Sequence, residues 1–242
     1  MSLKTVLLDF RSTIINDKSI RQTLLNQTLI SENLRPLTEE LPSFYAGRSD
    51  RACLQDIFHN RGRYITEQEL DKLVMLQSQA YQAKIAQLEE IPLYPEIEEF
   101  LKQLQSKNIL IGLVSEALLA EIELVLNRLN LKNYFRVIVS GEEIKNNKPE
   151  PDIYLLALRK LNLLSPELNL TAKNCLAVEN SFIGIKAAKQ ANLQVVGVAN
   201  NYPVHMLQRQ ANWAVDYLTE LELDRIQQVF SQGKEFSLAK NN

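Results

Sequence analysis

Four polar side chains that could do chemistry lie at the ends of short apolar runs of the sequence or in the stretch beyond them, and they are Asp9, Ser115, Lys148 and Glu179. Asp9 directly follows Val6–Leu8, which we interpret as a buried strand because both of its faces are apolar. In an open parallel sheet, ligands bind outside the carboxyl ends of the strands. Asp9 therefore stands where a reactive carboxylate is useful, although a strand-end aspartate can also simply begin a turn.

The elements that must position these side chains alternate between strand and helix from residue 92 onward. Strands are predicted at 6–8, 109–114, 137–139, 175–178, 195–198 and, as a short last strand, 215–218. Helices are predicted between them at 95–107, 116–129, 151–161 and 182–191. The alternation predicts an α/β fold with a doubly wound, Rossmann-like parallel sheet. Right-handed crossovers then bring the four polar side chains to one edge of the sheet. Taken singly, each of these side chains has an ordinary role in capping or on the solvent-exposed surface.

Residues 17–91 show no strand pattern and predict an all-helical cap domain inserted after the first strand. Its helices are expected at 19–32, 37–45, 51–60 and 66–90, the last with Thr66 as N-cap. The α/β core then comprises residues 1–16 and 92–230. Residues 231–242 are polar and are expected to form a frayed tail.

Composition and charge exclude several classes of partner. The 242 residues carry a formal net charge of -2 with a pI near 5.9, which gives no electrostatic reason to bind nucleic acid or an anionic membrane. No apolar run approaches the ~20 residues of a membrane-spanning helix. The two cysteines, Cys53 and Cys175, lie in apolar surroundings and are interpreted as buried thiols in a reducing compartment. Without a secretory signal pattern, a cytoplasmic protein is expected.

The core segments resemble the haloacid dehalogenase superfamily, in the helical-cap branch that includes phosphoglycolate phosphatases and β-phosphoglucomutases. The segments that carry the resemblance are 6–10 (VLLDF), 112–115 (GLVS), 148–154 (KPEPDIY) and 178–188 (VENSFIGIKAA). Leu93–Pro95 resembles the hinge that returns from the cap, and Gly47–Asp50 resembles a cap loop that reads the substrate. The resemblance extends from Leu3 to about Leu218 and implies a hydrolase that acts on small phosphorylated metabolites.

The resemblance also implies a role for each matching residue. Asp9 would be the nucleophile that forms an aspartyl-phosphate, while Ser115 and Lys148 would hold the transferring phosphoryl group. The implied magnesium ligands are Asp9, the backbone oxygen of Arg11, Glu179 and Asn180. The implied substrate contacts are Arg11, Ser115, Glu116 and Lys148 in the core, with Arg48 and Arg51 as candidate anion contacts in the cap.

The chain departs from the family pattern at two chemically decisive positions. The family has an aspartate two residues after the nucleophile, which protonates the leaving group and then activates water, but Arg11 stands here and can do neither. Asn180 replaces a second aspartate, so four positions that carry -4 in the family carry -1 here. We therefore expect weak or absent Mg²⁺ binding. Ser12 also replaces a glycine of the family pattern. For Arg11 two alternative roles remain: it clamps a substrate anion, or it forms an ion pair with Asp9.

Three functions remain open at this stage. The first is a phosphatase or phosphomutase with an aspartyl nucleophile, impaired by the loss of its acid–base aspartate. The second is a catalytically silent member that binds a metabolite or a protein partner. The third is a metal-free 2-haloacid dehalogenase, in which the second aspartate of the first motif is also replaced. The substrate, the oligomeric state and the identity of any protein partner do not follow from the residues.

Overall fold

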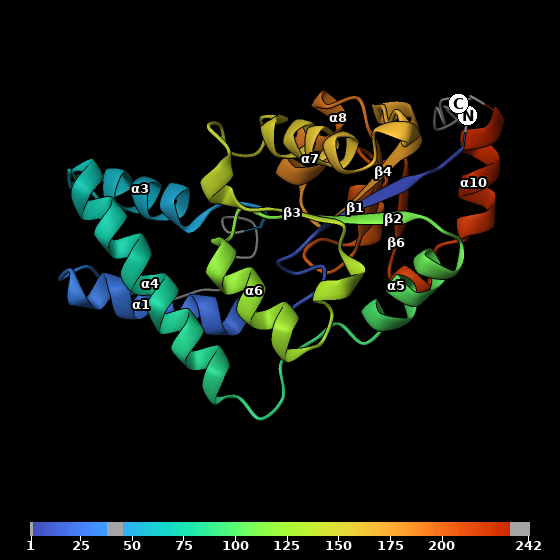
Figure 1. Cartoon of the computed structure of the whole chain (residues 1–242). Helices are drawn as coiled ribbons and strands as arrows, with labels where there is room; N and C mark the ends of the chain where they lie inside the picture. The colour runs from blue at the N-terminus through green and yellow to red at the C-terminus, as the bar shows by residue number, and fades with distance from the viewer. Residues whose placement is uncertain (1, 38–45, 233–242) are drawn as a thin grey trace.

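A computed structural model describes residues 2–37 and 46–232, so most of the helix predicted at 37–45 lies outside the described residues. Six parallel strands form one sheet in the order β3-β2-β1-β4-β5-β6 (Figure 1). Their bounds are β1 Thr5–Asp9, β2 Leu110–Val114, β3 Val137–Val139, β4 Cys175–Glu179, β5 Gln194–Val198 and β6 Trp213–Val215. The strand order reverses between β1 and β4, and such a switch point is where doubly wound sheets bind ligands. The predicted α/β class is confirmed.

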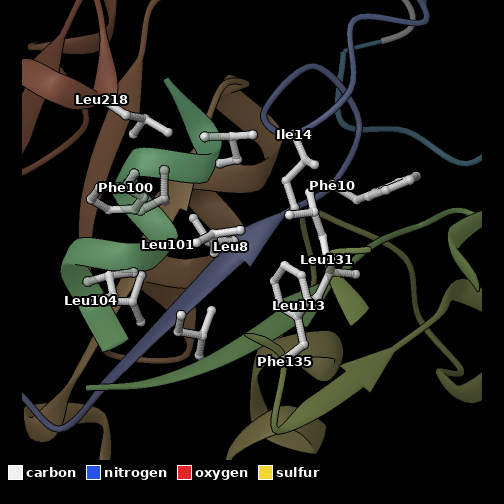
Figure 2. Packing of buried hydrophobic residues seen from close by; sticks show 14 of the residues in the cluster. Leu8, Phe10, Ile14, Phe100, Leu101, Leu104, Leu113, Leu131, Phe135 and Leu218 are labelled. Atoms are coloured by element: carbon white, nitrogen blue, oxygen red, sulfur yellow. The ribbon is translucent and has the colours of Figure 1, made fainter. Parts of the chain in front are cut away.

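The central strand β1 is buried on both faces because its side chains alternate between two apolar clusters. Val6 and Leu8 belong to one cluster and Leu7 belongs to the other. Figure 2 shows Leu8 facing Leu101 of the helix that covers the first face, in the cluster that also contains Leu113 of β2. All five residues of β1 are buried, as expected for a strand whose sheet is covered on both sides.

Helices from both sides complete this two-faced core (Figure 1). The first face is covered by α5 (Ile97–Ser106), α6 (Leu119–Arg128) and α10 (Leu223–Gln232). The second face is covered by α7 (Asp152–Leu164), α8 (Phe182–Gln190) and α9 (Val204–Leu207). Short 3-10 turns join several of these elements, at Lys132–Tyr134, Gly141–Glu143, Pro166–Leu168, Ala172–Asn174 and Leu218–Glu220.

A group of helices between β1 and α5 lies beyond the edge of the sheet where Asp9 ends β1 (Figure 1). Its described helices are α1 (Lys18–Ser31), α3 (Asp50–Asn60) and α4 (Glu67–Gln87), which we call the helical segment. These helices share an apolar cluster of their own, in which Leu29, Phe58 and Leu70 are buried. The two stretches of chain that connect the helical segment to the core lie side by side. Asn16 N donates to Pro92 O at 2.7 Å, and Tyr94 N donates to Ile14 O at 3.0 Å.

Several predicted boundaries differ from the structure. The last strand lies at Trp213–Val215, and Leu218–Glu220 forms a 3-10 turn instead of the end of a strand. Ser231 and Gln232, which were expected in the polar tail, belong to α10, whose amphipathic pattern buries Leu223, Ile226 and Phe230. The rest of the predicted tail lies outside the described residues. The helix expected at 116–129 begins only at Leu119, because the loop before it is held by contacts to the next strand. Among the described residues, no helix is long and apolar enough to cross a membrane.

Candidate active site

A lysine joins the two strand-end carboxylates at the centre of the sheet edge. Lys148 Nζ donates to Asp9 Oδ1 at 2.7 Å and to Glu179 Oε1 at 2.6 Å. The hydroxyl of Tyr154 also donates to Glu179 Oε1, at 2.5 Å. The three charged side chains are almost fully buried, at 0% exposure for Lys148 and Glu179 and 5% for Asp9. The predicted convergence of strand ends is therefore realised as direct contact.

Burial and neighbouring charges have opposing effects on the pKa values of this cluster. Burial disfavours the charge of Lys148, but the carboxylates of Asp9 and Glu179 outweigh it and raise the pKa of the lysine above its ordinary value. Burial raises the pKa of Glu179, an effect that Lys148 opposes and the charge of Asp9 reinforces. Lys148 is therefore a fixed cation at neutral pH, and it faces the carboxylate proposed to be the nucleophile.

The backbone around Glu179 fits this carboxylate closely. A Cβ added at Gly184 would lie 2.0 Å from Glu179 Oε2, so the first turn of α8 approaches the carboxylate as only a glycine can. Ser181 caps this helix by accepting a hydrogen bond from Gly184 N at 3.1 Å. The segment 178–188 thus holds the end of β4 and the start of α8 around the site.

Asn180, one residue after β4, holds the other side of Asp9. Its side-chain Nδ2 donates to Asp9 Oδ2 at 3.0 Å, to the backbone oxygen of Arg11 at 2.8 Å and to Thr13 Oγ1 at 2.7 Å. Its Oδ1 accepts a hydrogen bond from Asn201 Nδ2. Asn180 is fully buried. Each carboxylate oxygen of Asp9 thus has one donor, Lys148 on one side and Asn180 on the other.

Ser115 and Glu116 form the adjoining wall. Ser115 Oγ accepts a hydrogen bond from Ala117 N at 3.0 Å, which orients the hydroxyl and leaves its proton available to an anion. Glu116 Oε1 accepts a hydrogen bond from Lys148 N at 2.8 Å, so this side chain positions the lysine loop. Glu116 Oε2 is buried and has no hydrogen-bond partner among the described residues. Burial raises the pKa of Glu116, although Lys148 opposes the shift.

Arg11 turns away from Asp9 and enters a cluster of two arginines and two carboxylates. Its Nη2 donates to Asp50 Oδ2 at 2.9 Å and to Glu121 Oε2 at 2.7 Å. Arg21 completes the cluster by pairing with Asp50. Burial disfavours the charge of Arg11, but Asp50 and Glu121 outweigh it and raise its pKa. The expected alternative of an ion pair between Arg11 and Asp9 is wrong, because the guanidinium finds carboxylates on α3 and α6 instead.

A small cavity separates the sheet edge from the helical segment. Its volume is about 40 Å³, and its lining includes Asp9, Arg11, Ser115, Glu116, Arg21 and Arg48. Arg48 also pairs with Asp56 at 2.6 Å. Arg51 is absent from the lining and pairs with Glu67 and Asp71 on the outer side of α3 and α4. Of the two arginines expected as anion contacts, the structure therefore brings only Arg48 to the site.

Sequence reasoning missed several residues that the structure brings into contact with the site: Thr13, Arg21, Asp50, Glu121, Tyr154 and Asn201. Tyr154 lies inside the segment 148–154 and Asp50 inside the cap-loop match at 47–50, so their positions held a usable signal. The other four lie outside the matching segments and have no local pattern. Arg21 and Glu121 meet where the helical segment docks on the sheet edge, whereas Thr13 and Asn201 contact Asn180 within the core.

The donor set at this edge does not fit a magnesium ion. Magnesium requires several hard oxygen ligands in near-octahedral geometry. Here Asp9 Oδ2 and the Arg11 carbonyl oxygen accept hydrogen bonds from the amide of Asn180, and Glu179 Oε1 accepts from Lys148 and Tyr154. In the part of the chain that the structure describes, no group of three or more histidine, cysteine, aspartate or glutamate side chains is placed to hold a metal ion.

Comparison with known proteins identifies the family. The phosphorylated carbohydrates phosphatase of Thermotoga maritima is 35% identical over 108 residues, which cover 44% of this chain and 47% of that protein. The β-phosphoglucomutase of Bacillus subtilis is 31% identical over 170 residues, which cover 70% of each chain. The crystal structure of β-phosphoglucomutase from Clostridium difficile superposes with a TM-score of 0.81 at 26% identity, covering 95% of this chain and 98% of that one. Residues 6–198 match the family model, and the chain belongs to the haloacid dehalogenase-like hydrolases.

Proposed function

We propose that the protein binds small phosphorylated metabolites at Asp9, Ser115 and Lys148, and that its turnover of phosphate esters is low. The carboxylate, the hydroxyl and the ammonium group lie at one sheet edge, and the relatives named above carry phosphatase and phosphomutase activities. A buried ammonium group beside a nucleophile favours the approach of an anionic phosphoryl group. Asp9 is the proposed nucleophile.

The observation that carries this proposal is the engagement of Arg11 with Asp50 and Glu121. In the proposed reaction an oxygen of Asp9 forms a bond to phosphorus, and the bond from phosphorus to the ester oxygen breaks. The leaving alkoxide then needs a proton, and the water that hydrolyses the aspartyl-phosphate must lose one. A guanidinium with a raised pKa supplies neither an acid nor a base at this position.

We infer that the helical segment acts as a cap over this site. A cavity of about 40 Å³ is far smaller than the ~300–1,000 Å³ of typical small-molecule sites, so the segment must move away before a metabolite can enter. A hydrogen bond joins this segment to the core, since Asn147 Nδ2 donates to Ser49 Oγ at 3.0 Å. Gly47 also approaches the core closely, because a Cβ added there would lie 2.2 Å from Ser181 Oγ. Gly47 has a φ of +76°, which favours glycine at this close approach.

The proposal is tested by measuring binding and turnover separately. Calorimetry with a panel of phosphorylated sugars and phosphorylated hydroxy acids should find saturable binding that Lys148→Met weakens. Release of inorganic phosphate from the same panel should be slow, and Asp9→Asn should abolish what remains. Binding without any turnover would establish the silent alternative. Absence of binding for the whole panel, with the protein folded, would contradict the proposal.

A 2-haloacid dehalogenase is the second candidate function. It is favoured because Arg11 cannot act as an acid or base and because an amide, that of Asn180, contacts Asp9. Displacement of halide from a 2-haloacid by Asp9 breaks a carbon–halogen bond, and the halide leaves with the electron pair and needs no proton. Asp9 would form an ester to carbon, which water then hydrolyses. Halide release from 2-chloropropionate that disappears in Asp9→Asn would favour this reaction over phosphoryl transfer. No release of halide would exclude it for that substrate.

A further inference from the structure

Three acceptors converge on one amide nitrogen beside the proposed nucleophile. Asn180 Nδ2 lies 3.0 Å from Asp9 Oδ2, 2.8 Å from the Arg11 carbonyl oxygen and 2.7 Å from Thr13 Oγ1. All three acceptors come from β1 and the loop that follows it, whereas Asn180 follows β4. Asp9, Thr13 and Asn180 are buried, so these contacts are shielded from water.

The orientation of this amide follows from its neighbours. A carboxylate oxygen and a carbonyl oxygen can only accept hydrogen bonds, so an amide oxygen in the same place would face two acceptors without a proton between them. The opposite end of the side chain agrees, because Asn180 Oδ1 accepts from Asn201 Nδ2. Asn180 therefore presents its NH₂ group to Asp9 and to the Arg11 carbonyl.

These two oxygens are the atoms that the family resemblance assigns to magnesium. We propose that the side-chain amide of Asn180 takes the place of the divalent ion, so that the site holds Asp9 in position without a metal. The NH₂ group supplies partial positive charge to the same oxygens, and the remaining candidate ligand, Glu179 Oε1, is already engaged by Lys148 and Tyr154. The inference concerns how the site is held together and does not depend on the turnover proposed above.

Asn180 is thus a positioning residue for the carboxylate of Asp9. Lys148 holds Oδ1 and Asn180 holds Oδ2, so the two donors fix the rotation of the carboxylate. A divalent ion would bring two positive charges to the site, whereas the amide brings none. The positive charge that touches Asp9 is then that of Lys148 alone, among the described residues.

Magnesium titration of the substrate-free protein tests this inference. For the natural sequence we expect no saturable heat of Mg²⁺ or Mn²⁺ binding over the millimolar range, and no change of the melting temperature on adding EDTA. Asn180→Asp replaces the donor by an anionic ligand and should create a site whose occupation raises the melting temperature. The rise should be about 3–6 °C at ten times the dissociation constant.

Asn180→Leu is the matched control, because it removes the amide without supplying a ligand and should show no magnesium-dependent shift. Saturable Mg²⁺ binding by the natural sequence, lost in Asp9→Asn, would overturn the inference. This titration decides the matter even if the Asn180 variants do not fold. A phosphatase activity of the natural protein that EDTA leaves unchanged would support the inference, whereas activity restored to an EDTA-treated sample only by Mg²⁺ would contradict it.

Discussion

Ser12 adopts a backbone conformation that costs free energy for any residue with a Cβ. Its φ is +56°, in the left-handed region, and it stands where the family resemblance places a glycine. The conformation is held by its neighbours, since Ser12 N donates to Ile15 O at 2.9 Å and Asn200 Nδ2 donates to Ser12 O at 2.8 Å. These two hydrogen bonds hold the site loop in a conformation that a glycine would suit better.

We expect Ser12→Gly to stabilise the protein by about 0.5–1 kcal/mol, because glycine reaches a positive φ without the Cβ penalty and loses only part of that gain to chain entropy. Urea denaturation measures the change. Ser106→Gly is the control, because Ser106 ends a helix and is exposed, so the same substitution should destabilise there. A destabilising effect at both positions would contradict the strain argument.

A second prediction at this scale concerns Glu116 and pH. Burial raises the pKa of this carboxyl above 4.5, so the folded protein keeps the proton to a higher pH than the unfolded chain does. The contribution of the Glu116 carboxyl to the free energy of unfolding is complete below pH 4.5 and is lost as the pH rises through the raised pKa. Glu116→Gln should therefore gain stability relative to the natural protein as the pH rises from 4.5 to neutrality.

The exposed Glu167 provides the matched substitution, since Glu167→Gln removes a carboxylate from the surface rather than from the core. Parallel stability curves for the natural protein and Glu116→Gln across the same pH range would show that this carboxyl does not titrate as its burial implies. Thermal or urea unfolding at closely spaced pH values gives the comparison.

At the scale of elements, the ion cluster joins the helical segment to the sheet. Arg11 follows β1 and Glu121 lies on α6, whereas Arg21 lies on α1 and Asp50 begins α3. The exposed fraction of these four side chains ranges from 2% to 17%. Removing one partner of a buried ion pair is costly because an unpaired charge remains behind. Arg11, which stands where the resemblance places an acid–base aspartate, thus joins the helical segment to the core.

Asp50→Asn should destabilise the protein by about 3 kcal/mol, because Arg11 and Arg21 both lose a charged partner. It should also accelerate amide hydrogen exchange at the start of α3. The comparison is Asp71→Asn, which breaks the solvent-exposed pair with Arg51 and should cost less than about 1 kcal/mol. Equal effects of the two substitutions would mean that the cluster does not hold the helical segment in place.

At the scale of the whole molecule, the sequence was enough to predict the parallel sheet and the meeting of Asp9, Lys148 and Glu179 at its edge. Buried parallel strands are near-continuous apolar runs, and crossover handedness then fixes which ends meet. The partners of Arg11 and the orientation of Asn180 could not be predicted, because they depend on contacts with Asp50, Glu121 and Asn201 from distant segments. The position of β6 was missed because a three-residue edge strand has little pattern of its own.

Under the proposed function, Asp9, Ser115 and Lys148 hold the phosphoryl group, whereas Arg11 is paired with Asp50 and Glu121 and supplies no acid or base. The double variant Arg11→Asp with Asn180→Asp restores both lost carboxylates and should recover phosphatase activity in part. Ser12 limits the gain if the restored aspartate needs the freedom of a following glycine. Asp9→Asn in the same background is the control, since it removes the nucleophile.

The measurement that tests the central claim most directly is the rate of phosphate release by the natural protein and by this double variant with Mg²⁺, on one panel of phosphate esters. The account predicts slow release by the natural protein and a gain of at least ~10²-fold in the double variant, which Asp9→Asn abolishes, because general acid–base catalysis contributes about that much. Release by the natural protein at ~1–10³ per second, typical of an efficient enzyme, and abolished in Asp9→Asn, would contradict the account.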